Sequence, residues 1–134
     1  MFSHIFIGVT DFAAAHAFYA PLMAELGLRQ RFFEPERSWA AWQLKTGGRP
    51  LFIIGRPFDG APHLAGNGQM TAFMARDRQT VDKVYQAAIA SGGKDEGPPG
   101  IRPHYHANYY GAYFRDLDGN KLCVVCHEAP AADA

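Results

Sequence analysis

The stretch Thr10–Gly27, TDFAAAHAFYAPLMAELG, has a counterpart 66 residues later in Arg76–Gly93, RDRQTVDKVYQAAIASGG. Each contains an aspartate near its start that can cap a helix, Asp11 or Asp77, and each ends with a glycine that can close one. Between these signals, apolar residues recur at spacings of three and four, which predicts one apolar face on each helix. The two faces comprise Ala15, Phe18, Tyr19, Leu22 and Met23, and Val81, Val84, Tyr85, Ala88 and Ile89. Two unrelated capped helices could also align in this way, but the agreement of cap, face and closing glycine favours an internal duplication.

The first predicted helix contains one conflicting residue, Pro21. A proline inside a helix lacks the backbone donor and clashes with the preceding turn. We therefore expect this helix to kink or to end early.

Strand-like segments surround the two predicted helices in the same order in both halves. Residues 94–108, with three prolines, are the exception and indicate a long loop around a short strand. The other expected strands are residues 3–9, 28–33, 39–44, 51–54, 69–75, 109–115 and 121–127. The pattern predicts a single α+β domain, residues 1–134, built from two βαβββ modules. Its parts are module one at 3–55, a linker at 56–68, module two at 69–127 and a tail at 128–134.

The composition is that of one ordinary globular domain, with 134 residues of which 48% are hydrophobic and 19% charged. Lys plus Arg and Asp plus Glu each number 13, so no charge excess indicates nucleic acid or an anionic membrane as a partner. No apolar run reaches the ~20 residues of a membrane span, and no signal peptide is evident, so we expect a cytoplasmic protein. Cys123 and Cys126 lie three apart in one predicted strand, and we expect reduced thiols on opposite faces.

Three features together resemble the vicinal oxygen chelate superfamily, which includes glyoxalase I, bleomycin and fosfomycin resistance proteins, and extradiol dioxygenases. They are the repeated βαβββ order, Phe18-Tyr19 in the first helix, and RDLDGNKL at Arg115–Leu122. The stretch Gly100–Ala112, GIRPHYHANYYGA, is similar to a motif of a bacterial glyoxalase-like branch. The resemblance implies a curved, cup-like mixed sheet with the helices on its outer face, a divalent metal at the floor of the cup, and a homodimer.

The family's metal ligands usually come from the first and last strands of each module. Alternation along the first strand places His4, Phe6 and Gly8 in the cup, and His4 matches the family's first histidine ligand. Met70 and Cys123 stand where the family commonly has histidine and glutamate, and the strand at 51–54 offers no ligand at all. Hard divalent cations need oxygen and imidazole donors, so we expect no metal cofactor, with His4 as the ligand of a divalent metal if one binds. The softer set of His4, Met70 and Cys123 could suit Cu(I) or Zn²⁺, but the simpler interpretation is a satisfied His4 beside Met70 and Cys123, which line a mainly dry pocket. Phe6 and Met70 are then candidates for contact with a ligand.

The glyoxalase-like motif supplies further candidates for ligand contact. His104 and His106 are two apart, so in an extended segment they face one side and could share a metal or, with Arg102, hold an anionic substrate. Tyr109 and Tyr110 complete this set of candidates. The alternative is a folded lid whose polar groups bond its own backbone. We expect His63, in the linker, to be solvated.

The resulting hypothesis is a glyoxalase/bleomycin-resistance-like protein that binds a small organic molecule in its cup and lacks the usual metal site. If it is an enzyme, His4 would be the acid or base and Cys123 the nucleophile. One alternative is a metal-dependent lyase, of the lactoylglutathione lyase kind, or a dioxygenase. Another is a resistance-type protein that sequesters its ligand without turnover.

Overall fold

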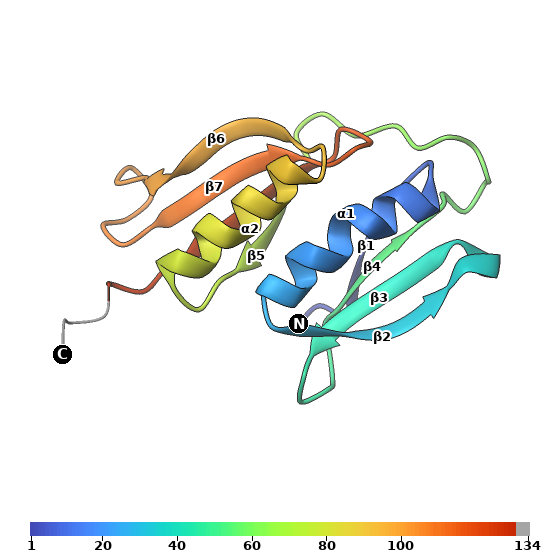
Figure 1. Ribbon diagram of the computed structural model, residues 1–134, viewed down its shortest axis with the longest axis horizontal. Helices are drawn as coiled ribbons and strands as arrows, with labels where there is room; N and C mark the ends of the chain where they lie inside the picture. Colours follow the sequence, from blue (N-terminus) through green and yellow to red (C-terminus); the bar gives the residue numbers. More distant parts are fainter. Residues whose placement is uncertain (131–134) are drawn as a thin grey trace.

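Each half of the chain builds one four-stranded sheet and one helix in the computed structural model, which describes residues 1–130 (Figure 1). This confirms the predicted α+β class and the two βαβββ modules. Module one contains β1 (His4–Gly8), α1 (Phe12–Glu25), β2 (Leu28–Glu34), β3 (Trp39–Leu44) and β4 (Leu51–Gly55), with a short 3₁₀ helix at Pro35–Arg37. Module two contains β5 (Thr71–Met74), α2 (Arg78–Ala90), β6 (Lys94–Ile101), β7 (Tyr110–Arg115) and β8 (Lys121–Cys126). Neither helix has the length and apolar character needed to cross a membrane.

The two sheets have the same strand order, β1-β4-β3-β2 in module one and β5-β8-β7-β6 in module two. In each, the first strand pairs in parallel with the last, and all other pairs are antiparallel. The strands therefore form one sheet per module, and β1 and β5 are edge strands of separate sheets. The far tail, residues 131–134, lies outside the described part of the chain.

Both helices begin where the sequence predicts. The Asp11 carboxylate accepts a hydrogen bond from the Ala14 backbone N–H at 3.1 Å, and the Asp77 carboxylate accepts one from Thr80 at 2.7 Å. The expectation that Pro21 ends the first helix early is wrong, since α1 continues to Glu25. The buried side chains that follow the proline, Leu22 and Met23, pack into the core, and this burial offsets the missing hydrogen bond.

The segment at 94–108 contains the expected strand, but β6 extends over eight residues where a short strand within a long loop was expected. It is the edge strand of its sheet, and its pairing with β7 has register shifts between Asp95 and Gly97 and between Gly97 and Gly100. Prolines are tolerated at such irregular edges because a missing donor breaks no ladder bond there. Pro98 and Pro99 both lie within the second of these shifts.

One hydrophobic core joins the modules. Helices α1 and α2 lie side by side and cover the same side of the molecule, with the strands behind them in the view of Figure 1. Phe52 of β4 and Phe73 of β5 meet edge to face with ring centroids 4.9 Å apart, and both belong to this core. Burial of aromatic rings across the boundary holds the two modules together.

A buried polar contact supports this packing. The Tyr19 hydroxyl of α1 donates to the Asp116 carboxylate in the turn between β7 and β8, and Asp116 is only 5% exposed. Burial and the Asp116 charge hold the pKa of Tyr19 well above its usual value, so the phenol remains a donor. Asp116 also accepts hydrogen bonds from the backbone N–H groups of Asp118 and Asn120, each at 2.9 Å. The first helix of module one is thus bonded directly to module two.

We predict that Tyr19→Phe lowers the free energy of unfolding by about 1–3 kcal/mol, because a buried carboxylate loses a donor. The matched control is Tyr85→Phe, which stands 66 residues later and whose hydroxyl bonds the Asp95 carboxylate at an exposed site. That change should stay within ~0.5 kcal/mol. Urea denaturation followed by circular dichroism measures both, and equal losses would refute the proposed role of the Tyr19 contact.

Candidate functional site

Module two carries an aromatic and thiol cluster on the sheet face that lies opposite the helices. Tyr113 of β7 stands across from Cys123 of β8, and the Tyr109 hydroxyl lies 2.9 Å from that of Tyr113 and 3.6 Å from Cys123 Sγ. Cys123 is fully buried, whereas Cys126 belongs to the helix-side core, so the two thiols face opposite sides as predicted. Burial raises the pKa of the Cys123 thiol, and burial together with the bond to Tyr113 raises that of Tyr109. At neutral pH all three groups are therefore protonated.

The glyoxalase-like motif folds over this cluster as a loop that bonds itself. His106 Nε2 lies 2.9 Å from His127 Nδ1, while the backbone N–H of Asn108 donates to His106 Nδ1 at 3.2 Å. The Arg102 guanidinium donates to the Pro98 carbonyl at 2.8 Å and lies over the Tyr113 ring. The His104 ring packs on Tyr105, at 4.3 Å between centroids, and lines none of the cavities described below. His104 and His106 therefore do not converge on one point with Arg102.

Tyr110 lies on the other face of the sheet. Its hydroxyl donates to the Asp82 carboxylate of α2 at 2.7 Å, and the Arg78 guanidinium lies over its ring at 5.2 Å from the centroid. Burial raises the pKa of Tyr110 to about 12. The structure thus separates Tyr110 from Tyr109 and places it among contacts between helix and sheet.

The family's metal positions do not form a coordination group. Within residues 1–130, no three His, Cys, Asp or Glu side chains come close enough together to hold a metal ion. His4 is exposed, with Nδ1 2.9 Å from the Ser3 hydroxyl, and it lines none of the described cavities. Met70 and Cys123 are weak donors for hard cations, so the residues present do not fit the metal that the family implies.

An apolar groove lies at one end of the seam between β1 and β5. Its volume is about 670 Å³, and its lining is mainly hydrophobic, with Ile5, Trp42, Leu51, Phe73 and Met74 among the contributors. The lining comes from both modules, because residues of β1, β2, β3 and β4 contribute to it together with residues of β5. His127 and Glu128 complete it beyond the end of β8, and with Gln43, Thr71 and Arg76 they are its polar residues.

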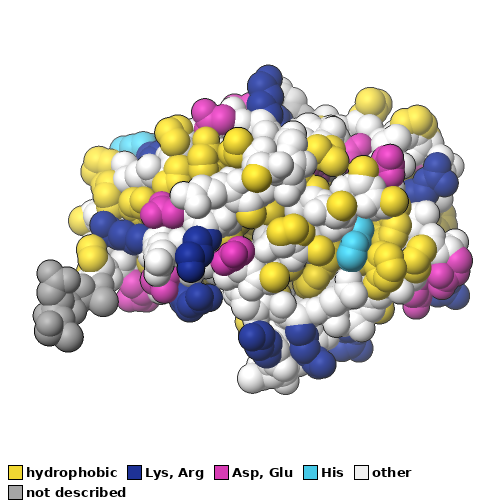
Figure 2. All heavy atoms as spheres, viewed as in Figure 1, with side chains coloured by type: hydrophobic (Ala, Val, Ile, Leu, Met, Phe, Trp, Pro, Cys, Tyr) yellow, Lys and Arg dark blue, Asp and Glu magenta, His cyan; other side chains and the backbone are white. Residues whose placement is uncertain are grey.

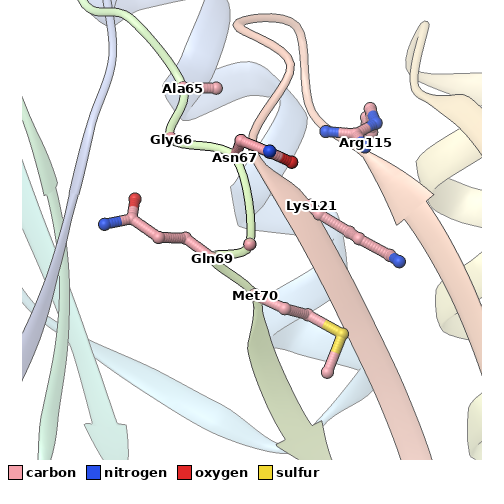
Figure 3. A pocket seen from close by; sticks show the side chains of 8 residues that line it. Ala65, Gly66, Asn67, Gln69, Met70, Arg115 and Lys121 are labelled. Atoms are coloured by element: carbon pink, nitrogen blue, oxygen red, sulfur yellow. The ribbon is translucent and has the colours of Figure 1, made fainter.

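Two smaller, polar cavities adjoin each other at the opposite end of the seam, where the linker approaches the sheets. Their volumes are about 460 Å³ and 210 Å³, and both are lined by Gln69, Met70 and Lys121. Phe6 lines the smaller one, so the structure brings Phe6 and Met70 together as expected for neighbouring pocket residues. Figure 3 shows Lys121 and Met70 extending in the same direction, with Gln69 on the other side of the chain pointing away from them.

His63 is a cavity residue that the sequence did not reveal. The linker has no periodicity, so nothing in the pattern fixes where its side chains point, and solvation was expected. In the structure His63 lies over Gly8 and lines the smaller polar cavity. A glycine inside a strand often marks a close approach of another group, and Gly8 was the available signal.

Comparisons with known proteins agree with this architecture. A sequence model of the Glyoxalase/Bleomycin resistance protein/Dioxygenase superfamily matches residues 1–124. A solved glyoxalase/bleomycin resistance protein from Albidiferax ferrireducens is 34% identical, covers 96% of this chain and 99% of its own, and has a TM-score of 0.81. A family enzyme from Burkholderia phytofirmans is 21% identical, with coverage of 94% and 98% and a TM-score of 0.68, and at that identity shows the fold alone. No curated protein matches the chain.

We predict that Cys123 reacts with Ellman's reagent at least about a hundredfold more slowly in the native protein than in the unfolded chain, because attack requires opening of a buried, protonated site. The Cys126→Ser variant isolates the Cys123 signal. Tyr109→Ala, which removes the ring beside the sulfur, should accelerate the reaction. Rapid native reaction at neutral pH would instead indicate an activated nucleophile.

Proposed function

The chain belongs to the glyoxalase/bleomycin resistance protein/dioxygenase superfamily, and we propose that it binds a small, largely apolar organic molecule in the groove between its two modules. The observation that supports this most directly is the groove itself. Cavities of several hundred Å³ with apolar walls and a few polar groups are the usual sites for small molecules. The groove, of about 670 Å³, has this character.

The proposal does not require the metal of the family. His4, Met70 and Cys123 supply one imidazole, one thioether and one protonated thiol, and the β4 strand LFIIG supplies no ligand. The alternative of a metal-dependent lyase or dioxygenase would need a donor set that these positions do not provide.

Binding without turnover also accounts for the state of Cys123. A nucleophilic cysteine needs a lowered pKa and access to its substrate, whereas this thiol is buried and its pKa is raised. His4 is exposed, its Nδ1 lies 2.9 Å from the Ser3 hydroxyl, and it lines none of the described cavities. A ligand-sequestering role is therefore favoured over covalent catalysis.

We predict that N-phenyl-1-naphthylamine, a neutral fluorescent apolar probe, binds the EDTA-treated protein at one site. Met74→Asp, which places a charge in the groove, should weaken binding about tenfold or more, equivalent to ~1.4 kcal/mol. Leu64→Asp is the matched control, because Leu64 is exposed on the linker and lines no described cavity.

Two results would count against the groove as the site. The first is equal weakening by both substitutions. The second is loss of binding after EDTA treatment, with recovery when Mn²⁺ or Zn²⁺ is added. If the His4→Ala variant then failed to recover, the function would be metal-dependent, with His4 as a ligand.

A second copy of the chain is the partner that we expect. The outer edge strands β2 and β6 each pair on one side only within the described residues, and Phe33 of β2 and Ile101 of β6 are 44% and 39% exposed. Unpaired strand edges with apolar side chains are commonly covered by association. The helix-bearing face in Figure 2 instead mixes hydrophobic side chains with charges of both signs.

We therefore predict that multi-angle light scattering at micromolar concentration gives twice the chain mass of 14.8 kDa. A mass of one chain across the accessible concentration range would remove the dimer from the proposal.

A further inference from the structure

We propose that the polar end of the seam is a second binding site, for a small organic carboxylate that bears an adjacent hydroxyl group, with His63 as its proton acceptor and Lys121 as its cation. This site is separate from the apolar groove, and it stands whether or not the groove binds a ligand. It rests on charge, on a fixed imidazole tautomer and on an adjoining pair of cavities.

The charge of the site favours an anion. No carboxylate of residues 1–130 lines either cavity, whereas Lys121 lines both and Arg115 lines the larger one. The Arg115 charge is already met by Glu96, with Nε at 2.7 Å from the carboxylate. Lys121 has no carboxylate within ion-pair distance among the described residues, and its ammonium instead lies over the Tyr113 ring at 5.6 Å from the centroid. Lys121 is thus a cation available to a ligand.

The tautomer of His63 follows from the orientation of Asn120. Asn120 Nδ2 donates to the Gly8 carbonyl at 3.0 Å and to the Asp116 carboxylate at 2.8 Å, so the amide cannot be turned over without losing both bonds. Asn120 Oδ1, an acceptor only, therefore faces His63 Nε2 at 2.7 Å. Nε2 must carry the proton, and in the neutral ring Nδ1 is left with its lone pair.

The His63 ring lies over Gly8 of β1, with Nδ1 as its nearest atom. Nδ1 lies 2.2 Å from the position that a Cβ on Gly8 would occupy. Gly8 alternates with the core residues Ile7 and Val9, so this position is on the side of β1 opposite the core. Among the described residues this nitrogen makes no hydrogen bond, whereas the backbone N–H of His63 is held by the Thr10 hydroxyl at 3.0 Å. The unpaired acceptor therefore belongs to a residue that lines the smaller cavity and is held at two points, its ring by Asn120 and its backbone by Thr10.

The chemistry that fits is a carboxylate at Lys121 with a hydroxyl hydrogen bond to His63 Nδ1. Phe6 and Met70 add apolar surface to the smaller cavity, which suits an aromatic substituent on the acid. An acid that lacks the hydroxyl would leave the Nδ1 acceptor unpaired and should bind less tightly.

The test uses the full chain with mandelate as the probe and phenylacetate as its analogue without the hydroxyl. Long-range ¹H–¹⁵N correlation spectra should show His63 with a protonated Nε2 and an unprotonated Nδ1. The His63 signals are assigned as those that disappear in the His63→Gln variant. Mandelate should shift the Nδ1 signal and should bind about tenfold more tightly than phenylacetate, the ratio expected for one hydrogen bond of ~1.4 kcal/mol. Lys121→Gln should weaken both acids, and His63→Gln should remove the preference for mandelate.

The chain offers matched controls. His16 also bonds an amide oxygen, Gln30 Oε1 at 2.7 Å, but lines no described cavity, and Lys83 lies on α2 away from the site. His16→Gln and Lys83→Gln should leave mandelate binding unchanged. The reverse tautomer, equal binding of the two acids, or no binding at millimolar concentration would each overturn the proposal.

Discussion

The buried carboxylate of Asp116 is the constraint on which the arrangement of the two modules depends. It accepts hydrogen bonds from the Tyr19 hydroxyl of α1, from two backbone N–H groups of its own turn and from the Asn120 side chain. A buried charge without these donors would cost several kcal/mol, so the turn and the helix must stay together. Asn120 carries the connection further, to the Gly8 carbonyl and to His63. One side chain therefore links the helix docking to the geometry of a cavity.

This network has no counterpart at the other end of the seam, and the duplication is broken there. Tyr19 and Tyr85 occupy equivalent positions, yet Tyr85 bonds Asp95 within its own module. The linker also reaches only one end, where His63 and residues 65–68 line the polar cavities, and none of residues 56–68 lines the groove. The same pair of modules therefore offers a polar end and an apolar end, which is a physical basis for two ligand chemistries on one fold.

The features predictable from sequence are those set by local signals. Aspartate caps, helical spacing and strand alternation located both helices, and they placed Ile7 and Val9 in the core and Phe6 and Gly8 opposite. The early end of the helix at Pro21 and the shortness of the strand within residues 94–108 were predicted wrongly, because tertiary packing and edge position outweigh local propensity. The position of His63 could not be predicted, since it depends on a hydrogen bond to Asn120, 57 residues away. A bond of this kind produces no periodic pattern in the sequence.

Alternation also explains how the fold can persist while its site changes. In β8, Leu122 and Val124 enter the core shared with the helices, whereas Lys121 and Cys123 face the other way. Substitutions on the second set leave the alternation that buries the first set unaltered, so an exposed position such as Met70 can change its chemistry at little cost in stability, whereas the fully buried Cys123 cannot. Separation of core and ligand faces by a period of two therefore lets a chain of this superfamily exchange metal donors for apolar or cationic groups. The two ends of the seam in this protein are consistent with such an exchange.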